Sequence, residues 1–266
     1  MDTRKKFEPP QLTVEKLSEE LVIANLKLKE ANEKLLAEET ARNEMFASIS
    51  HDLRSPITAI KNAVELLNTY ESFTKENVTP LLSLMEGRIQ ILEHMINDIF
   101  LLVSLDNHCI SMNKKTIPLG FFLEDYFFSC EADPNYAQRK LSLEVSEDLD
   151  ANVWVDEMHL TRVLENLFTN ALKYSNTGDT ITLGAYIKEE QVIVYVEDNG
   201  IGISKEHIDR IFDRCFIVEK ARTPGHSSTG LGLSITQSII EHFSGKIWCE
   251  STLGEGSRFS FSLPLC

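Results

Sequence analysis

One uninterrupted stretch constrains the fold more than any other feature of this sequence. Between Pro10 and Pro56 the chain contains neither proline nor glycine, so no strong helix breaker occurs there. Apolar or small residues recur in alternating steps of three and four, at Val14, Leu17, Leu21, Ala24, Leu28, Ala31 and Leu35. This heptad spacing predicts a coiled coil of about three heptads. The alternative is one amphipathic helix that packs on its own domain, although no neighbouring segment is suited to cover the stripe.

The helical pattern continues past Pro56 and then occurs a second time. Apolar positions run on to Leu67, the polar segment "NTYESFTKEN" (68–77) interrupts them, and a second stripe extends from Val78 to Val103. Two helices with a short polar connection form an αα-hairpin. Because a lone hairpin buries too little apolar surface, we expect two copies to pair into a four-helix bundle, which makes the chain a homodimer.

From about residue 114 the pattern changes to strands and helices in mixed order. Segments that alternate or run apolar predict strands at 140–145, 180–187, 191–198, 246–252 and 257–264. Helical stretches lie at 119–131, 156–174, 204–210 and 231–243. The prediction is an α+β fold, a sandwich with helices on one face of a sheet. We expect three parts: an arm with a coiled-coil helix (1–42), the helical hairpin (43–108) and the α+β domain (114–266).

Composition excludes several classes of protein. The net charge of −15, from 26 basic and 41 acidic residues, argues against nucleic-acid binding. Five scattered cysteines without a CxxC pair predict neither a zinc site nor a disulfide framework, and favour a reducing cytosol. No run approaches the roughly 18 apolar residues of a membrane helix, so we expect no membrane insertion by this chain. It is expected to be cytoplasmic, which is also compatible with the soluble part of a longer, membrane-associated protein.

The segment "FASISHDLRSPITAI" (46–60) carries one histidine on the first predicted helix. If Phe46, Ile49 and Leu53 form the packed face, His51 lies about 170° from its centre and points outward, with Ser55 on the same side. Pro56 cannot donate to the carbonyl of Asp52, so the helix is expected to kink or loosen there. The outward position excludes a core role for His51. It leaves two interpretations, an ordinary surface histidine or a reactive group.

Three further motifs combine polar side chains with turns. In "VLENLFTNALKYSNTG" (163–178), Asn166, Asn170 and Lys173 share one helix face, either as buried hydrogen-bonded amides or as ligands for a hard cation and phosphate. In "VEDNGIGIS" (196–204), a strand ends at Asp198 before Gly200 and Gly202, a pattern that ordinary turns also show. In "PGHSSTGLGLSITQ" (224–237), Gly230 and Gly232 precede a helix, whose N-terminal N–H groups suit phosphate.

Taken in order, the motifs "SHDLRSP", "NLFTNALKYS", "DNGIGI", "STGLGLS" and "GEGSRFSF" resemble those of the sensor histidine kinases of two-component signalling. The resemblance covers residues 43–264. It implies a dimerisation and phosphotransfer hairpin, followed by a Bergerat-type α/β sandwich with a mixed sheet that binds ATP and Mg²⁺. The implied activity is phosphorylation of His51 from ATP. The phosphoryl group then passes to an aspartate on a separate response-regulator receiver domain.

The resemblance also implies roles for individual residues. His51 matches the phosphoacceptor and Asp52 the residue that orients its ring and takes its proton. Ser55 occupies a position where threonine or asparagine usually orients the water that dephosphorylates the partner. Asn170 matches the magnesium ligand, supported by Asn166. The other implied nucleotide-site residues are Lys173 on phosphate, Tyr174 as an aromatic contact, Asp198 on the adenine amino group, and Gly200, Gly202, Arg222, Thr229, Gly230, Leu231 and Gly232 around the nucleotide and its lid.

The sequence departs from the family pattern at the segment "IFDRCFIVEK" (211–220). Cys215 and Ile217 stand where phenylalanine and arginine are common, so a lid arginine for the phosphates would be Arg214 or Arg222. Two rival functions stay open: an ATPase or serine kinase of the same GHKL superfamily, and a non-catalytic dimeric scaffold. In the related ATPases a water-activating glutamate stands where this sequence has Asn166, which favours phosphotransfer over hydrolysis.

Overall fold

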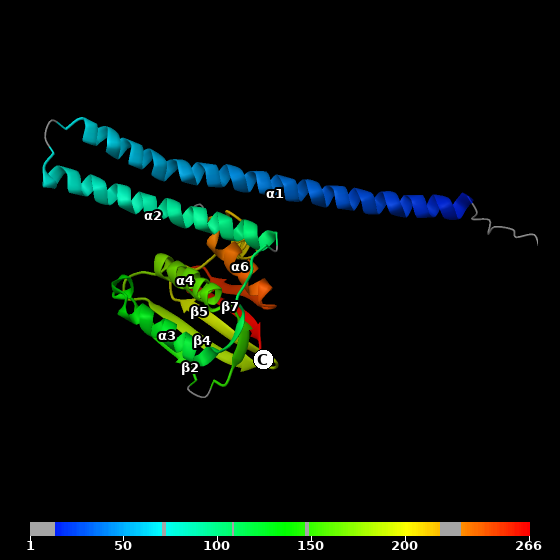
Figure 1. Ribbon diagram of the computed structural model, residues 1–266. Coiled ribbons are helices and arrows are strands. Elements are labelled where there is room, and N and C mark those ends of the chain that lie inside the picture. Colours follow the sequence, from blue (N-terminus) through cyan, green and yellow to red (C-terminus); the bar gives the residue numbers. More distant parts are fainter. Residues whose placement is uncertain (1–13, 71–72, 108, 147–148, 219–229) are drawn as a thin grey trace, which may run out of the picture. The chain divides into compact units, whose positions relative to one another are not determined.

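The structure of the chain is a computed structural model that describes residues 14–70, 73–107, 109–146, 149–218 and 230–266 (Figure 1). Its elements, in chain order, are α1 (Val14–Asn68), α2 (Lys75–Asp106), β1 (Lys115–Pro118), α3 (Leu119–Ala132), the 3₁₀ helix η1 (Pro134–Tyr136), β2 (Lys140–Val145), β3 (Asn152–Val155), α4 (Glu157–Tyr174), β4 (Thr180–Lys188), β5 (Gln191–Asp198), α5 (Lys205–Ile208), α6 (Gly232–His242), β6 (Lys246–Thr252) and β7 (Gly256–Pro264).

Helix α1 is a single helix of 55 residues. The helix expected from the heptad pattern is confirmed, and it continues unbroken through Pro56. Along the predicted seam, Leu17, Leu21, Leu28 and Leu35 are all exposed in the single chain. Apolar side chains in this spacing are normally buried against another helix or domain, and in the single chain these four leucines are not. Pairing of α1 with a second copy stays a prediction.

The face of α1 around His51 differs from the prediction at one position. Met45 and Ile49 are buried, whereas Phe46 is half exposed. The packed face is therefore turned slightly from the one drawn through Phe46, because at 100° per residue Met45 and Ile49 form the tighter pair. The outward position of His51 is nevertheless confirmed, since its side chain is 71% exposed.

The connection between α1 and α2 ends one helix and starts the next. Thr74 is the N-cap of α2, and its backbone N–H donates to Oδ1 of Asn77 at 2.9 Å, which is one half of a capping box.

On α2, Met95, Leu102 and Leu105 are buried, while Ile96, Phe100 and Val103 are exposed. The second helix predicted by the stripe is confirmed. Its exposed apolar row is the surface that a four-helix bundle would cover.

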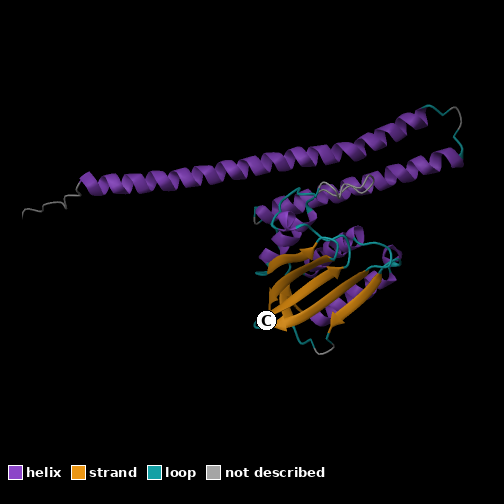
Figure 2. Ribbon diagram, turned by 180° about the vertical axis from the view of Figure 1, so that it is seen from behind, coloured by secondary structure: helices purple, strands orange, loops and turns teal. Residues whose placement is uncertain are grey.

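The second half of the chain forms a five-stranded mixed sheet in the order β2-β4-β5-β7-β6. Strand β2 pairs parallel to β4, and the other neighbours pair antiparallel. Helices α3, α4 and α6 pack on one face of this sheet (Figure 2). Alternate side chains such as Leu183, Val194 and Phe261 are buried between sheet and helices, as period-two strands require. The predicted α+β fold is confirmed.

A two-stranded antiparallel sheet of β1 and β3 lies outside the five-stranded sheet. The sequence did not predict it, because each strand has only four residues, too few for alternation to stand out. Within the described ranges, no helix combines the length and apolar character needed to cross a membrane.

Candidate functional site

His51 stands on the exposed side of α1 next to its acidic neighbour. Its Nδ1 lies 3.2 Å from Oδ1 of Asp52, whose side chain is only 19% exposed. Adjacent side chains on a helix usually diverge, so this contact is closer than sequence position alone would suggest. With Nδ1 beside the carboxylate, Nε2 is the ring nitrogen left for chemistry. Ser55 is exposed one turn further along α1.

Helix α4 presents the predicted polar stripe. Its N-cap Asp156 accepts a hydrogen bond from the backbone N–H of His159 at 3.2 Å, which fixes where the helix begins. Leu164, Leu167 and Ala171 are buried on one face. The half-buried side chains on the other side are Asn166, Asn170 and Lys173. The spacing of these three residues therefore places them as the sequence predicted.

Asn166 joins α4 to the N-terminal part of α6. Its Nδ2 donates to Oγ1 of Thr236 at 2.7 Å. A Cβ added to Gly232 would lie 2.3 Å from Oδ1 of Asn166, so only glycine permits this approach. Asn166 is thus a structural bridge between two helices that border the site, a contact that the sequence did not reveal.

Asn170 has a different environment. Its half-buried amide makes no side-chain hydrogen bond with any residue in the described ranges. A half-buried amide without a protein partner has an oxygen available for a ligand. Three residues on, Nζ of Lys173 lies 5.0 Å from the ring centroid of Tyr174. The carbonyl of Tyr174 accepts a hydrogen bond from the N–H of Ile201 at 3.0 Å, which connects the end of α4 to the turn after β5.

Arg139 secures the C-terminus of α4. Its Nε donates to Oγ of Ser175 at 2.9 Å, and its Nη2 donates to the carbonyls of Ser175 at 2.8 Å and Leu172 at 3.3 Å. These carbonyls have no partner within the helix, and a cation there also suits the helix dipole. This role could not be predicted from the sequence, because Arg139 stands in the connection before β2.

Asp198 ends β5 as a buried carboxyl group, 5% exposed. Burial raises the pKa of Asp198 to about 6, although backbone N–H groups of Gly200 and Ser257 donate to it and oppose the rise. Gly202 has φ +65°, and a Cβ there would meet the carbonyl oxygen of Thr252 at 2.0 Å. The turn therefore requires glycine at 202 in order to pass so close to the end of β6.

The glycine-rich segment before α6 is described from Gly230 onward. Leu231 is fully buried, and Gly230 has φ +66° and accepts a hydrogen bond from the N–H of Cys215 at 3.1 Å. Arg222 and Thr229, both predicted to border the nucleotide, lie outside the described residues. Arg214, the other candidate lid arginine, instead pairs with Asp106 on α2, with Nη2 to Oδ1 at 2.5 Å.

Taken together, these residues offer two separate chemical capabilities. His51 is an exposed nucleophile with a carboxylate on its other ring nitrogen. Around the end of α4, a buried hydrogen-bond acceptor (Asp198), an available amide (Asn170) and an ammonium group (Lys173) border the glycine-rich turns. Such a set is suited to a ligand with both a donor-bearing ring and an anionic end.

Two family models match the chain. The model described as His Kinase A (phospho-acceptor) domain matches residues 41–108. The model described as Histidine kinase-, DNA gyrase B-, and HSP90-like ATPase matches residues 155–266. The first match contains His51, and the second contains the polar stripe of α4, Asp198 and the glycine-rich turn before α6.

Curated relatives agree with the family matches, and a solved structure shares the fold. The chain is 32% identical to the sensor histidine kinase WalK of Bacillus subtilis over 225 residues, which is 84% of this chain and 36% of WalK. It is 30% identical to the sensor protein kinase WalK of Staphylococcus aureus over 233 residues, 85% of this chain and 54% of that protein. The chain thus spans between about a third and about half of these relatives. Its fold is similar to that of histidine kinase ThkA, solved in complex with response regulator protein TrrA, at a TM-score of 0.68 and 22% identity, over 91% of this chain and 67% of ThkA.

Proposed function

Because the chain belongs to the sensor histidine kinases of two-component systems, we propose that it is an ATP-dependent autokinase that phosphorylates its own His51. The phosphoryl group then passes to an aspartate on a response-regulator receiver domain, carried by a separate protein. The observation that supports this most directly is the exposed imidazole of His51 with Asp52 on its Nδ1 side.

The pair suggests how the histidine reacts. Nε2 attacks the γ-phosphorus of ATP in line, so that an N–P bond forms while the P–O bond to ADP breaks. The Nδ1–H of the ring points toward the carboxylate of Asp52, which holds the tautomer with a free Nε2 lone pair and takes the proton as the ring gains positive charge. Because His51 is exposed, a second domain can approach it, first with ATP and later with the receiver aspartate.

The residues around the end of α4 fit ATP and Mg²⁺. Ionised Asp198 can accept a hydrogen bond from the adenine amino group, and the ammonium of Lys173 can contact phosphate. The amide oxygen of Asn170, which has no partner in the described ranges, suits a hard cation. When bound there, Mg²⁺ would neutralise charge on the phosphates. Asn166 is engaged with Thr236 and, as an amide, cannot act as a base for water, which favours transfer to His51 over hydrolysis.

The proposal includes a homodimer. The exposed apolar rows of α1 and α2 supply the surface that two hairpins would bury in a four-helix bundle. The heptad seam of α1 would continue the pairing toward the N-terminus. Ser55, exposed one turn from His51, would hold a water molecule near a phosphorylated partner.

Labelling with ATP carrying a γ-phosphate label tests the proposal directly. We expect wild-type protein to acquire an acid-labile label that is absent in His51→Gln and reduced roughly a hundredfold in Asn170→Ala, since lost charge stabilisation has effects of this size. Asn62→Gln, which changes an exposed side chain on α1 of the same hairpin, is the matched control and should label normally.

Two other outcomes would reject the autokinase. An acid-stable label that persists in His51→Gln would identify a serine or threonine kinase of the GHKL superfamily. Absence of nucleotide binding at millimolar ATP with Mg²⁺ would identify a non-catalytic scaffold.

A further inference from the structure

Two ion pairs join α2 to the module formed by residues 115–266, here called the catalytic module. Asp98 pairs with Arg162 of α4, and eight residues later Asp106 pairs with Arg214 of the segment before Cys215. Eight residues correspond to about 12 Å along a helix, so the two acids are well separated anchor points. Helix α2 also packs against α6, which lies next to its C-terminal end in Figure 1.

The residues that lead from α2 into the catalytic module are fixed to the same surface. The backbone N–H of Asn113 donates to Oδ2 of Asp156, the N-cap of α4, at 2.7 Å. Nζ of Lys114 donates to the carbonyl of His242, the last residue of α6, at 2.5 Å. The contacts from Asp98 to Lys114 therefore hold one defined docked arrangement of the module.

The exposure of the two ion pairs indicates that this arrangement is reversible. The side chains of Asp98 and Arg162 are 24% and 34% exposed, and those of Asp106 and Arg214 are 35% and 42% exposed. Ion pairs in contact with water contribute little, because the charges are screened and two long side chains lose freedom. Burial raises the pKa of Asp98, and the charges of Arg162 and His94 oppose the rise. Such contacts can select one of two states without making it permanent.

In the docked arrangement, the guanidinium of Arg214 is engaged by Asp106. The next residue, Cys215, donates its N–H to the carbonyl of Gly230 at 3.1 Å. Gly230 lies two residues before the N-terminus of α6, where backbone N–H groups attract phosphate. Arg214 therefore adjoins a residue held against the glycine turn before α6, whereas its guanidinium is bound to Asp106.

From these contacts we infer that Asp98–Arg162 and Asp106–Arg214 form a latch that holds the catalytic module in a resting arrangement on α2. Release of the latch frees Arg214 to contact the phosphates of ATP. The inference rests on the proposed autokinase activity and adds a means of restraining it. A signal that shifts α2 needs only to break two weak ion pairs in order to change the population of the resting state.

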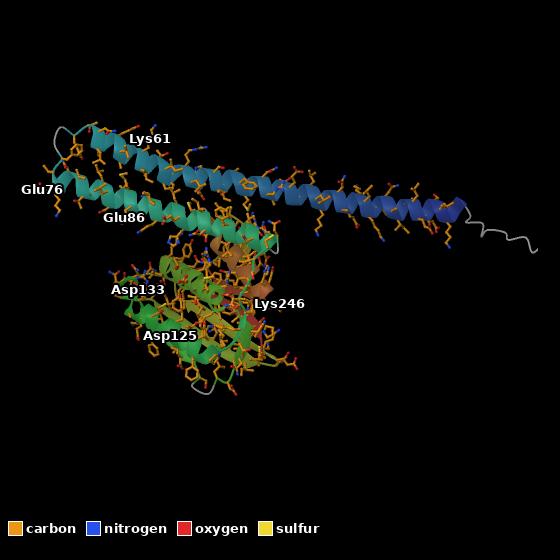
Figure 3. All side chains as sticks on the ribbon, viewed as in Figure 1. Lys61, Glu76, Glu86, Asp125, Asp133 and Lys246 are labelled. Carbon is orange, nitrogen blue, oxygen red and sulfur yellow. The ribbon has the colours of Figure 1, made fainter. Side chains whose placement is uncertain are left out.

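Neutralising the acids of α2 is the test. In Asp98→Asn and Asp106→Asn the initial rate of His51 labelling should rise two- to fivefold each, the range that corresponds to the loss of a water-exposed ion pair. Labelling of the wild type should rise with salt concentration, and the double variant should lose this dependence. Glu86→Gln is the matched control, because Glu86 is an exposed acid of α2 without an ion pair in the described ranges (Figure 3).

A double variant with exchanged charges and a variant of Arg214 complete the experiment. Asp98→Arg combined with Arg162→Asp should return the rate to that of the wild type. Arg214→Met breaks the same ion pair as Asp106→Asn, but should fail to raise the rate and should raise the KM for ATP. A rate that falls or stays constant in Asp98→Asn and Asp106→Asn overturns the latch, and a rate that rises equally in Arg214→Met overturns the phosphate role of Arg214.

A readout independent of activity separates this inference from the proposed function. Amide hydrogen exchange over residues 98–106 should be faster in the two asparagine variants than in the wild type, and unchanged in Glu86→Gln. If exchange responds but no variant labels His51, the latch stands and the autokinase fails. If wild-type His51 is labelled and exchange does not respond, the latch fails alone.

Discussion

Burial of the Asp198 carboxyl group destabilises the folded protein at neutral pH when no ligand is bound. Its carboxyl group is buried, and its pKa is raised from 3.8 to about 6. Because the folded-state pKa exceeds the unfolded one, the stabilising contribution of this group is complete below pH 3.8 and is lost as the pH rises through 6. At neutral pH the ionised side chain therefore costs about 3 kcal/mol of folding free energy, at 1.36 kcal/mol per pKa unit.

Asp198→Asn should remove this cost. Without nucleotide, the variant should melt at a higher temperature than the wild type at pH 7.5, and about half of the difference in free energy should remain at pH 5. Its affinity for ATP should fall, because an amide accepts more weakly from the adenine amino group than a carboxylate does. Thermal melts at both pH values and calorimetric titration with ATP measure the two effects. A lower melting temperature of the variant at pH 7.5 would contradict this account.

Residues on a regular element could be placed from sequence, whereas residues that act through distant contacts could not. The helical spacing of Asn166, Asn170 and Lys173 and the outward position of His51 follow from 100° per residue. The bond from Asn166 to Thr236 and the pairs of Arg162 and Arg214 join positions far apart in the chain. Nothing local in the sequence encodes such pairs, because they depend on how the elements pack.

At the scale of the element, the C-terminus of α4 depends on a side chain from outside the helix. Arg139→Ala would leave the carbonyls of Leu172 and Ser175 without their charged donor, which should destabilise the domain by about 1–3 kcal/mol. Lys173 and Tyr174 lie in the same turn, so the KM for ATP should rise as well. Arg139→Lys keeps the positive charge but not the several N–H donors of the guanidinium. Its stability and its KM for ATP should therefore lie between those of the wild type and those of Arg139→Ala.

Denaturant unfolding together with the KM for ATP tests this role of Arg139. Unfolding that shifts while the KM stays constant would limit Arg139 to stability alone. A mutant with neither change would show that the cap is dispensable.

Most elements were predictable because they are long compared with their period. The five strands of the main sheet and helices α3, α4 and α6 lie where the apolar pattern predicts them, with ends that differ by one or two residues. On α1 the predicted packed face is wrong at Phe46, because a choice between adjacent positions depends on packing rather than on period. The pair of β1 and β3 was missed because four residues do not establish a period.

At the scale of the whole molecule, the described residues leave apolar surface without cover. Leu21, Leu28 and Phe100 are 64%, 68% and 69% exposed, and they lie on the two helices that are expected to pair with a second copy. A homodimer would account for this surface. The apolar rows favour that assembly, whereas the charge of −15 gives no information on it.

The continuity of α1 gives the molecule a mechanical property. Because one helix carries both the heptad seam and His51, the angular position of the seam and that of the histidine are tied together. Inserting one residue after Leu36 would turn everything upstream by about 100° relative to His51, whereas inserting seven would restore the angle to within about 20°. Basal labelling of His51 should therefore change with one inserted residue and recover with seven. Equal labelling rates at every insertion length would mean that rotation is not transmitted. Rates that recur with a period of seven inserted residues would show that α1 transmits rotation to His51.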